Sequence, residues 1–198
     1  MKPQKVHVYF DFKSPYSFIA MDAYFSLQKK IPIELVWHPI SLPLDVMEKN
    51  YGQVSKRSSV QLNKVKYLYR DCRRQRPDLM IRPPIRYFDS RLSAAACNFA
   101  FENEKGELFI QKCFPKVFSR EIEPDNIEHL SKLLESLGLD SSMFKQDQER
   151  FFKKTTDEWQ EFVNQGGFGI PTAAYENELF WGALQIPFLE KKLSSTES

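Results

Sequence analysis

The first forty residues follow a strand–helix–strand pattern, and this pattern constrains the fold more than any other feature of the chain. Residues 6–11 (VHVYFD) form an apolar strand pattern, and Phe18, Met21 and Phe25 then recur at the spacing of one helical face. A second apolar run covers residues 33–40. Two strands joined by a helix of this length predict a parallel, right-handed βαβ unit.

The turn between the first strand and the helix reads Ser14-Pro15-Tyr16-Ser17. Ser14 can cap the helix and Pro15 suits its first turn. A hydroxyl group there lies beside free backbone N–H groups and the positive end of the helix dipole, which favours an anion such as a thiolate. Because both outer positions are serine and not cysteine, dithiol exchange is excluded, but the turn could hold the thiolate of another molecule.

A long helical region follows the second strand. Pro115 is expected to bend or end one of its helices. Asp140 or Ser141 can cap a later helix, whose apolar face runs from Phe144 to Val163 before the glycines at 166 and 167. The apolar stripes that mark the earlier helices are Val65, Leu68, Tyr69 and Cys72; Leu92, Ala95, Ala96 and Phe99; Phe109, Cys113, Phe114 and Val117; and Leu130, Leu133, Leu134 and Leu137.

The chain closes with a β-hairpin and a helix. Residues 172–175 and 178–181 are strand-like and flank the turn residues Glu176 and Asn177. A short helix is expected over residues 184–193. The order βαβ, helices, ββα predicts an α/β protein with a thioredoxin-like fold and a large all-helical insertion. The predicted domains are residues 1–41 with 165–198 for the thioredoxin-like part, and 42–164 for the insertion.

In that fold, Pro171 at the start of a strand would face the N-terminus of the first helix. An X-Pro bond at such a close approach can be cis, although trans is the general expectation. The backbone N–H and C=O groups of Ile170 would then be available to an extended, peptide-like ligand.

Composition excludes several classes of function. The net charge of +2 does not predict nucleic-acid binding, and no apolar run approaches the ~20 residues that a membrane span needs. Three scattered histidines and three scattered cysteines predict no zinc site. Cys72 and Cys97 fall on apolar helical faces and are interpreted as core residues. An odd number of cysteines without a signal-peptide pattern favours a cytoplasmic location.

Four blocks stand in the order found in a known family: residues 11–17 (DFKSPYS), 64–71 (KVKYLYRD), 168–172 (FGIPT) and 178–182 (ELFWG). With them the chain resembles 2-hydroxychromene-2-carboxylate isomerases and the related kappa-class glutathione transferases, which have the DsbA-like form of the thioredoxin fold. The resemblance covers roughly residues 5–193.

The resemblance implies bound glutathione, a catalytic serine at Ser14 and a cis-proline at Pro171. It implies that Ile170 pairs with the cysteinyl backbone of glutathione and that Lys64 holds the glycine carboxylate. One departure weakens this site: residues 183–185 are Ala-Leu-Gln, where the family has a small polar residue, Asp and Arg for the γ-glutamyl end. His38 also replaces a basic residue of the family, and we interpret it as a structural or surface histidine.

The sequence therefore predicts a glutathione-dependent cis-trans isomerase that acts on a small conjugated or aromatic substrate by reversible thiolate addition. A kappa-type glutathione transferase is an alternative, because the same thiolate would serve both reactions. A non-catalytic DsbA-like binding module with a degenerate glutathione site is a second alternative. The resemblance also suggests a homodimer.

Overall fold

The computed structural model describes residues 3–53 and 55–195. Residues 1–2, 54 and 196–198, which the predicted domain ranges include, lie outside the described residues. In chain order the elements are β1 (Gln4–Phe10), α1 (Pro15–Lys30), β2 (Ile33–Pro39), α2 (Leu44–Tyr51), α3 (Ser59–Gln75), α4 (Arg91–Glu102), α5 (Gly106–Ser119), α6 (Ile127–Glu135), α7 (Ser141–Gln146), α8 (Gln148–Asn164), β3 (Thr172–Tyr175), β4 (Glu178–Trp181), the 3₁₀ turn η1 (Ala183–Gln185) and α9 (Ile186–Ser195).

The sheet has the strand order β2-β1-β3-β4. β1 and β2 are parallel, with Val6 opposite Leu35, which confirms the βαβ unit. β3 and β4 form the predicted hairpin and join β1 antiparallel, with Val8 opposite Ala173. The structure therefore confirms the predicted α/β fold, in which one sheet combines both ends of the chain.

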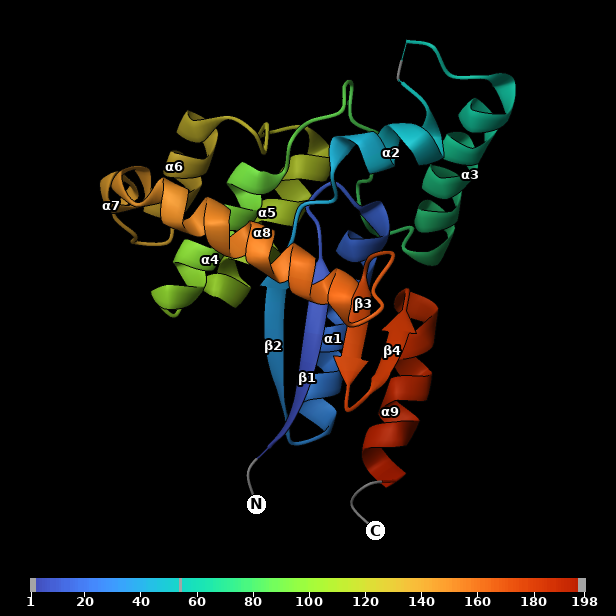
Figure 1. Ribbon diagram of the computed structural model, residues 1–198, viewed down its shortest axis with the longest axis vertical. Helices are drawn as coiled ribbons and strands as arrows, with labels where there is room; N and C mark the ends of the chain where they lie inside the picture. The colour runs from blue at the N-terminus through green and yellow to red at the C-terminus, as the bar shows by residue number, and fades with distance from the viewer. Residues whose placement is uncertain (1–2, 54, 196–198) are drawn as a thin grey trace.

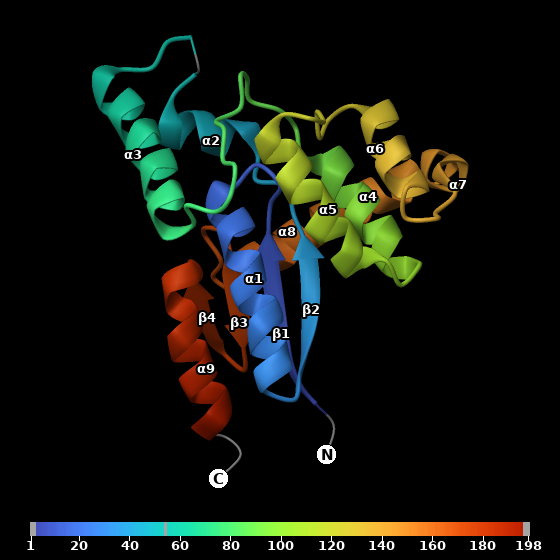
Figure 2. The same ribbon diagram turned by 180° about the vertical axis from the view of Figure 1, so that it is seen from behind.

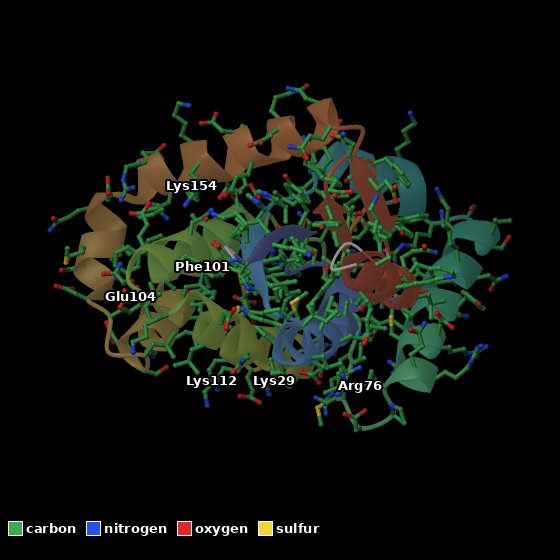
Figure 3. The ribbon with its side chains drawn as sticks, turned by 90° about the horizontal axis from the view of Figure 1, so that it is seen from below. Lys29, Arg76, Phe101, Glu104, Lys112 and Lys154 are labelled. Carbon is green, nitrogen blue, oxygen red and sulfur yellow. The ribbon has the colours of Figure 1, made fainter. Side chains whose placement is uncertain are left out.

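Helices cover both faces of this sheet. α8 crosses one face (Figure 1), whereas α1 and α9 lie on the other (Figure 2). Seen from below, Lys154 of α8 and Lys29 of α1 accordingly lie on opposite sides of the sheet (Figure 3). α2 and α3 lie beyond the carboxyl ends of β1 and β2, at the end of the sheet where α1 begins.

The structure decides two helix boundaries. Of the two effects expected of Pro115, the helix end does not occur, because α5 continues to Ser119. The buried residues Phe114 and Phe118 both stack on Phe18 of α1, and this packing outweighs the backbone hydrogen bond that a proline removes. The predicted face from Phe144 onward belongs to two helices, α7 and α8, which are separated at Asp147. Aspartate disfavours helix interiors because its carboxylate competes for local hydrogen bonds, and here it accepts one from Arg150.

One apolar cluster connects the sheet with the helical region. Phe10 and Phe12 of the β1 end pack against Phe114 of α5, with ring centroids 5.9 and 4.7 Å away. Phe12 also meets Phe109 edge-on. The segments assigned to two domains thus share their core, while the position of the domain boundaries stays a prediction.

Candidate functional site

A cavity of about 490 Å³ lies where α1 begins, between the sheet and the helices α2 and α3. Its wall is rich in aromatic residues and carries three basic side chains. The lining residues come from the β1–α1 turn, the β2–α2 loop, α2, α3, the α3–α4 loop, the β3 entrance and β4: Asp11, Lys13, Ser14, Pro15, Tyr16, Leu42, Met47, Tyr51, Arg57, Lys64, Val65, Tyr67, Leu68, Tyr69, Pro83, Pro84, Tyr87, Phe88, Phe168, Gly169, Ile170 and Trp181.

Ser14 stands at the N-terminus of α1, in this cavity. Its backbone is extended (φ −90°, ψ 115°), and its Oγ accepts a hydrogen bond of 3.0 Å from the Ser17 N–H. Pro15 occupies the first turn, as predicted. Because a hydroxyl group has one donor and two acceptor sites, the Ser14 O–H proton is still available to an acceptor in the cavity.

The β3 entrance forms another part of the wall. The Ile170–Pro171 peptide bond is cis, as the family resemblance implied. Ile170 lines the cavity, whereas Pro171 is buried directly behind it. The Pro171 carbonyl accepts from the Gly182 N–H at 2.8 Å. Within residues 3–53 and 55–195, no hydrogen bond engages the N–H or C=O group of Ile170.

Lys64 reaches the cavity from α3, and its Nζ atom lies 4.9 Å from the centre of the Tyr51 ring. The structure thus brings Ser14, Lys64 and Ile170 to one cavity, although they are far apart in the sequence. Their predicted roles toward glutathione stay predictions.

Sequence reasoning missed a buried ion pair directly beneath Ser14. The carboxylate of Asp11 is fully buried, and Lys13 Nζ lies 3.2 Å from it. Asp11 also accepts the backbone N–H groups of Lys13 and Leu42, at 2.8 and 2.7 Å. Lys13 Nζ donates to Ser41 Oγ and to the Leu42 carbonyl, at 3.1 and 2.7 Å. The signal in the sequence was a pair of opposite charges at the end of an apolar strand.

Arg57 was also missed, because it lies in the α2–α3 loop, where no periodic pattern exists. Its Nε donates to the Tyr51 carbonyl at 3.0 Å and its Nη2 donates to the Tyr87 hydroxyl at 2.8 Å. The guanidinium group is therefore held in place at the cavity wall.

None of the three cysteines reaches this cavity. Cys72, Cys97 and Cys113 are all buried, which confirms the interpretation of the first two as core residues. Burial, with a contribution from the neighbouring Asp71 carboxylate, raises the pKa of Cys72 to about 12. Burial also raises the pKa of the Cys97 and Cys113 thiols. Any thiolate in the cavity must therefore come from a ligand.

Two positions where the chain departs from the family lie outside the cavity wall. Leu184, in η1, is 72% exposed. His38 faces α8: its ring stacks on Tyr9 with centroids 4.5 Å apart, its Nε2 lies 2.9 Å from His7 Nδ1, and its Nδ1 lies 3.4 Å from a Glu158 oxygen. These contacts agree with a structural role for His38.

Metal-binding clusters and membrane-spanning helices are both absent from the described part of the chain. No group of three or more histidine, cysteine or acidic residues there is arranged to hold a metal ion. No helix within residues 3–53 and 55–195 has the length and apolar character to cross a membrane.

Comparison with known proteins identifies the family. The profile of the DSBA-like thioredoxin domain matches residues 5–194. The chain is 26% identical over 197 residues to the 2-hydroxychromene-2-carboxylate isomerase of Sphingobium xenophagum, covering 95% of this chain and 97% of that relative. Among solved structures, a 2-hydroxychromene-2-carboxylate isomerase superposes with a TM-score of 0.77 at 23% identity, covering 97% of this chain and 95% of the other.

More distant structures share the same fold. A probable DsbA oxidoreductase from Streptomyces coelicolor gives a TM-score of 0.75 at 14% identity, covering 97% of this chain and 89% of the other. The cytosolic disulfide reductase DsbM from Pseudomonas aeruginosa, solved with GSH, gives 0.65 at 16% identity, covering 96% and 99%. With a family profile that spans nearly its whole length, the chain belongs to the DSBA-like thioredoxin domain family.

Proposed function

We propose that the protein is a glutathione-dependent cis-trans isomerase that acts on a conjugated aromatic acid. The observation that carries the proposal is one cavity in which the Ser14 hydroxyl group, at a helix N-terminus, and the Ile170 backbone meet, while no cysteine of the chain reaches it. The similarity to a 2-hydroxychromene-2-carboxylate isomerase over nearly the full length of both chains supports this reaction class.

The residues of the cavity fit most of a glutathione molecule. The unbonded N–H and C=O groups of Ile170 suit the peptide backbone of the cysteinyl residue. Lys64 supplies a cation for the glycine carboxylate. The γ-glutamyl ammonium group would lack its carboxylate partner, because Leu184 stands where relatives have aspartate. A lost charge-assisted hydrogen bond corresponds to roughly 1.5–3 kcal/mol, so we expect weakened binding.

When bound, glutathione would supply the sulfur that adds reversibly to the conjugated double bond and so allows rotation about it. Ser14 would donate its hydroxyl proton in a hydrogen bond to that sulfur, and the free N–H groups of α1 would favour its anionic form. Tyr16 would remain a neutral phenol, because burial and its 2.8 Å hydrogen bond to Asp71 raise its pKa. The aromatic wall would hold a flat substrate against these groups.

A second candidate function, a non-catalytic binding module, is favoured by the exposed Leu184 and the loss of charge at that end of the site. Calorimetric titration with glutathione separates the two, together with a spectroscopic assay of 2-hydroxychromene-2-carboxylate isomerisation with and without glutathione. Glutathione-dependent turnover supports the isomerase. Absence of binding at millimolar glutathione favours the binding module. Accumulation of a glutathione conjugate without isomerisation indicates a transferase.

A further inference from the structure

The orientation of Arg57 at the cavity wall has a consequence for substrate recognition. The guanidinium group has five N–H donors, of which one binds the Tyr51 carbonyl and one binds the Tyr87 hydroxyl. Tyr87 in turn donates its own proton to the Gly52 carbonyl at 3.0 Å, so its oxygen can only accept from Arg57. Three N–H donors of Arg57 remain for a ligand.

Among the described residues, the positive charge of Arg57 also has no counterion. Arg76, Arg86 and Arg150 form ion pairs with carboxylates at the surface. For Arg57, by contrast, no carboxylate lies within 4 Å among the residues that the structure describes. Arg57 is only partly exposed, yet it lines a cavity instead of projecting into solvent. A planar cation of this kind, fixed and unneutralised, is suited to a carboxylate.

The other cations of the cavity wall are placed differently. Lys13 is neutralised by Asp11 and uses further donors on Ser41 and Leu42. Lys64 lies against the ring of Tyr51, one turn into the α3 helix. Next to Arg57 stand aromatic surfaces instead: its Cζ is 5.2 Å from the centre of the Tyr87 ring, and its charge acts on the buried phenol of Tyr69.

We propose that Arg57 is the specificity-determining residue that binds the carboxylate group of an aromatic acid substrate, with the rings of Tyr69 and Tyr87 beside the aromatic part. The inference rests on the proposed function and deepens it by assigning a residue to the acid group. Arg57 would recognise the substrate, whereas Lys64 would face the thiol ligand.

The test is calorimetric titration, without glutathione, with 2-hydroxycinnamate and with its uncharged amide. Arg57→Gln should weaken binding of the acid about tenfold or more, because a charge-assisted hydrogen bond is lost. Its affinity for the amide should stay within about twofold of the wild-type value. Lys64→Gln is the matched control, because it removes one charge from the same cavity. Its affinity for the acid should stay within about twofold of the wild-type value. Arg57→Lys should fall between wild type and Arg57→Gln, since it keeps the charge but loses the planar donor set.

Three results would overturn the proposal. Arg57→Gln could lose affinity for the acid and for the amide equally, or Lys64→Gln could lose as much affinity for the acid as Arg57→Gln does. The wild type could also bind the acid no more tightly than the amide. Reduced glutathione affinity in Arg57→Gln with unchanged acid affinity would also overturn it, because Arg57 would then serve the thiol ligand. If Arg57→Gln does not fold, Arg57→Lys and Tyr87→Phe decide, and both should weaken acid binding severalfold. If acid binding depends on Arg57 but the protein shows no glutathione-dependent turnover, the proposed function is refuted and the assignment of Arg57 stands.

Discussion

At the scale of single residues, Ser14 combines a structural contact with a chemical role in the proposed function. Its oxygen caps α1 through the Ser17 N–H, and its proton would serve the bound sulfur. Ser14→Ala removes both, whereas Ser14→Gly removes the hydroxyl group but keeps most of the capping preference. We expect Ser14→Ala to lose about 1 kcal/mol of stability and Ser14→Gly only a few tenths.

Both variants should bind glutathione nearly as well as wild type and lose turnover about tenfold or more, because each lacks the donor to sulfur. Thermal unfolding, calorimetry and an isomerisation assay measure the three quantities. Ser14→Thr is the control that retains a hydroxyl group and should retain most of the turnover. If turnover in the three variants varied with stability and not with the presence of a hydroxyl group, Ser14 would be a helix cap without a role in catalysis.

Leu184 provides the second residue-level prediction. Its side chain is exposed, and the family resemblance implies an acid at this position for the γ-glutamyl ammonium group. Leu184→Asp should therefore tighten glutathione binding by about 1 kcal/mol or more, measured by calorimetry. Phe188→Asp adds the same charge to a neighbouring exposed position of α9 and should have little effect. If the wild type binds glutathione tightly and Leu184→Asp leaves this affinity unchanged, the proposed loss of the γ-glutamyl contact is wrong.

The parts of the site that could be predicted are those that a local motif encodes. Ser14 before a proline at a helix start and Ile170 before Pro171 at a strand start each carry their geometry in a few adjacent residues. Arg57 and Lys13 could not be found in this way. The position of Arg57 depends on Tyr87, thirty residues away, and that of Lys13 on the β2–α2 loop. Only the tertiary fold brings these partners together.

At the scale of elements, the Asp11–Lys13 pair joins the β1–α1 turn to the β2–α2 loop. Four hydrogen bonds of the pair run within this junction, and both side chains are almost fully buried. Lys13→Met would leave the Asp11 carboxylate buried without its counterion. Because breaking a buried pair costs about 3–5 kcal/mol, we expect a loss near 3 kcal/mol, since two backbone N–H groups still serve Asp11.

Urea unfolding at neutral pH measures this loss. Lys5→Met is the matched control, because Lys5 pairs with Glu34 in an exposed position of the same sheet. An exposed pair contributes at most about 1 kcal/mol, so the control should unfold close to wild type. Equal stability of Lys13→Met and Lys5→Met would show that the junction does not depend on the buried charge.

The same scale explains which elements the sequence could predict. The strands, α1 and the hairpin follow from short patterns whose period and turn residues agree with one another. The behaviour of the chain at Pro115 and Asp147 does not follow from such patterns. Packing keeps the helix continuous at Pro115, and competition for local hydrogen bonds separates α7 from α8 at Asp147. Pro115 is tolerated since Phe114 and Phe118 are held by Phe18, a contact across about half of the chain.

At the scale of the whole molecule, the sheet is packed from both sides, and the two sides have different chemistry. On the α1 side, the core combines aromatic and aliphatic side chains and continues to the candidate site through Tyr69 and Phe88. On the α8 side lies a smaller cluster of Tyr9, Ile40, Phe162 and Ala174, in which Tyr9 stacks on one of a pair of histidines. His7 of β1 and His38 of β2 lie 2.9 Å apart at their ring nitrogens, with Glu158 of α8 beside them.

This histidine pair predicts how stability depends on pH. The pKa of His7 is lowered, chiefly by burial and next by the nearby His38, although Glu161 and Glu34 act in the opposite direction. Below the ordinary histidine pKa of about 6.5, the unfolded chain therefore binds more protons at this site than the folded chain. The free energy of unfolding must then decrease as the pH falls from about 6.5 through the lowered pKa of the folded protein.

Urea unfolding between about pH 7.5 and about pH 5.5 brackets this window while staying above the range in which exposed carboxylates titrate. We expect His7→Gln, which keeps a hydrogen-bonding side chain opposite His38, to flatten the pH dependence. His129→Gln, at the third histidine of the chain, should keep the wild-type slope, since His129 bonds within the α6 region away from the sheet. If the slope were the same in wild type and His7→Gln, proton binding at the β1–β2 pair would not couple to folding, and the contact of α8 with the sheet would be insensitive to pH.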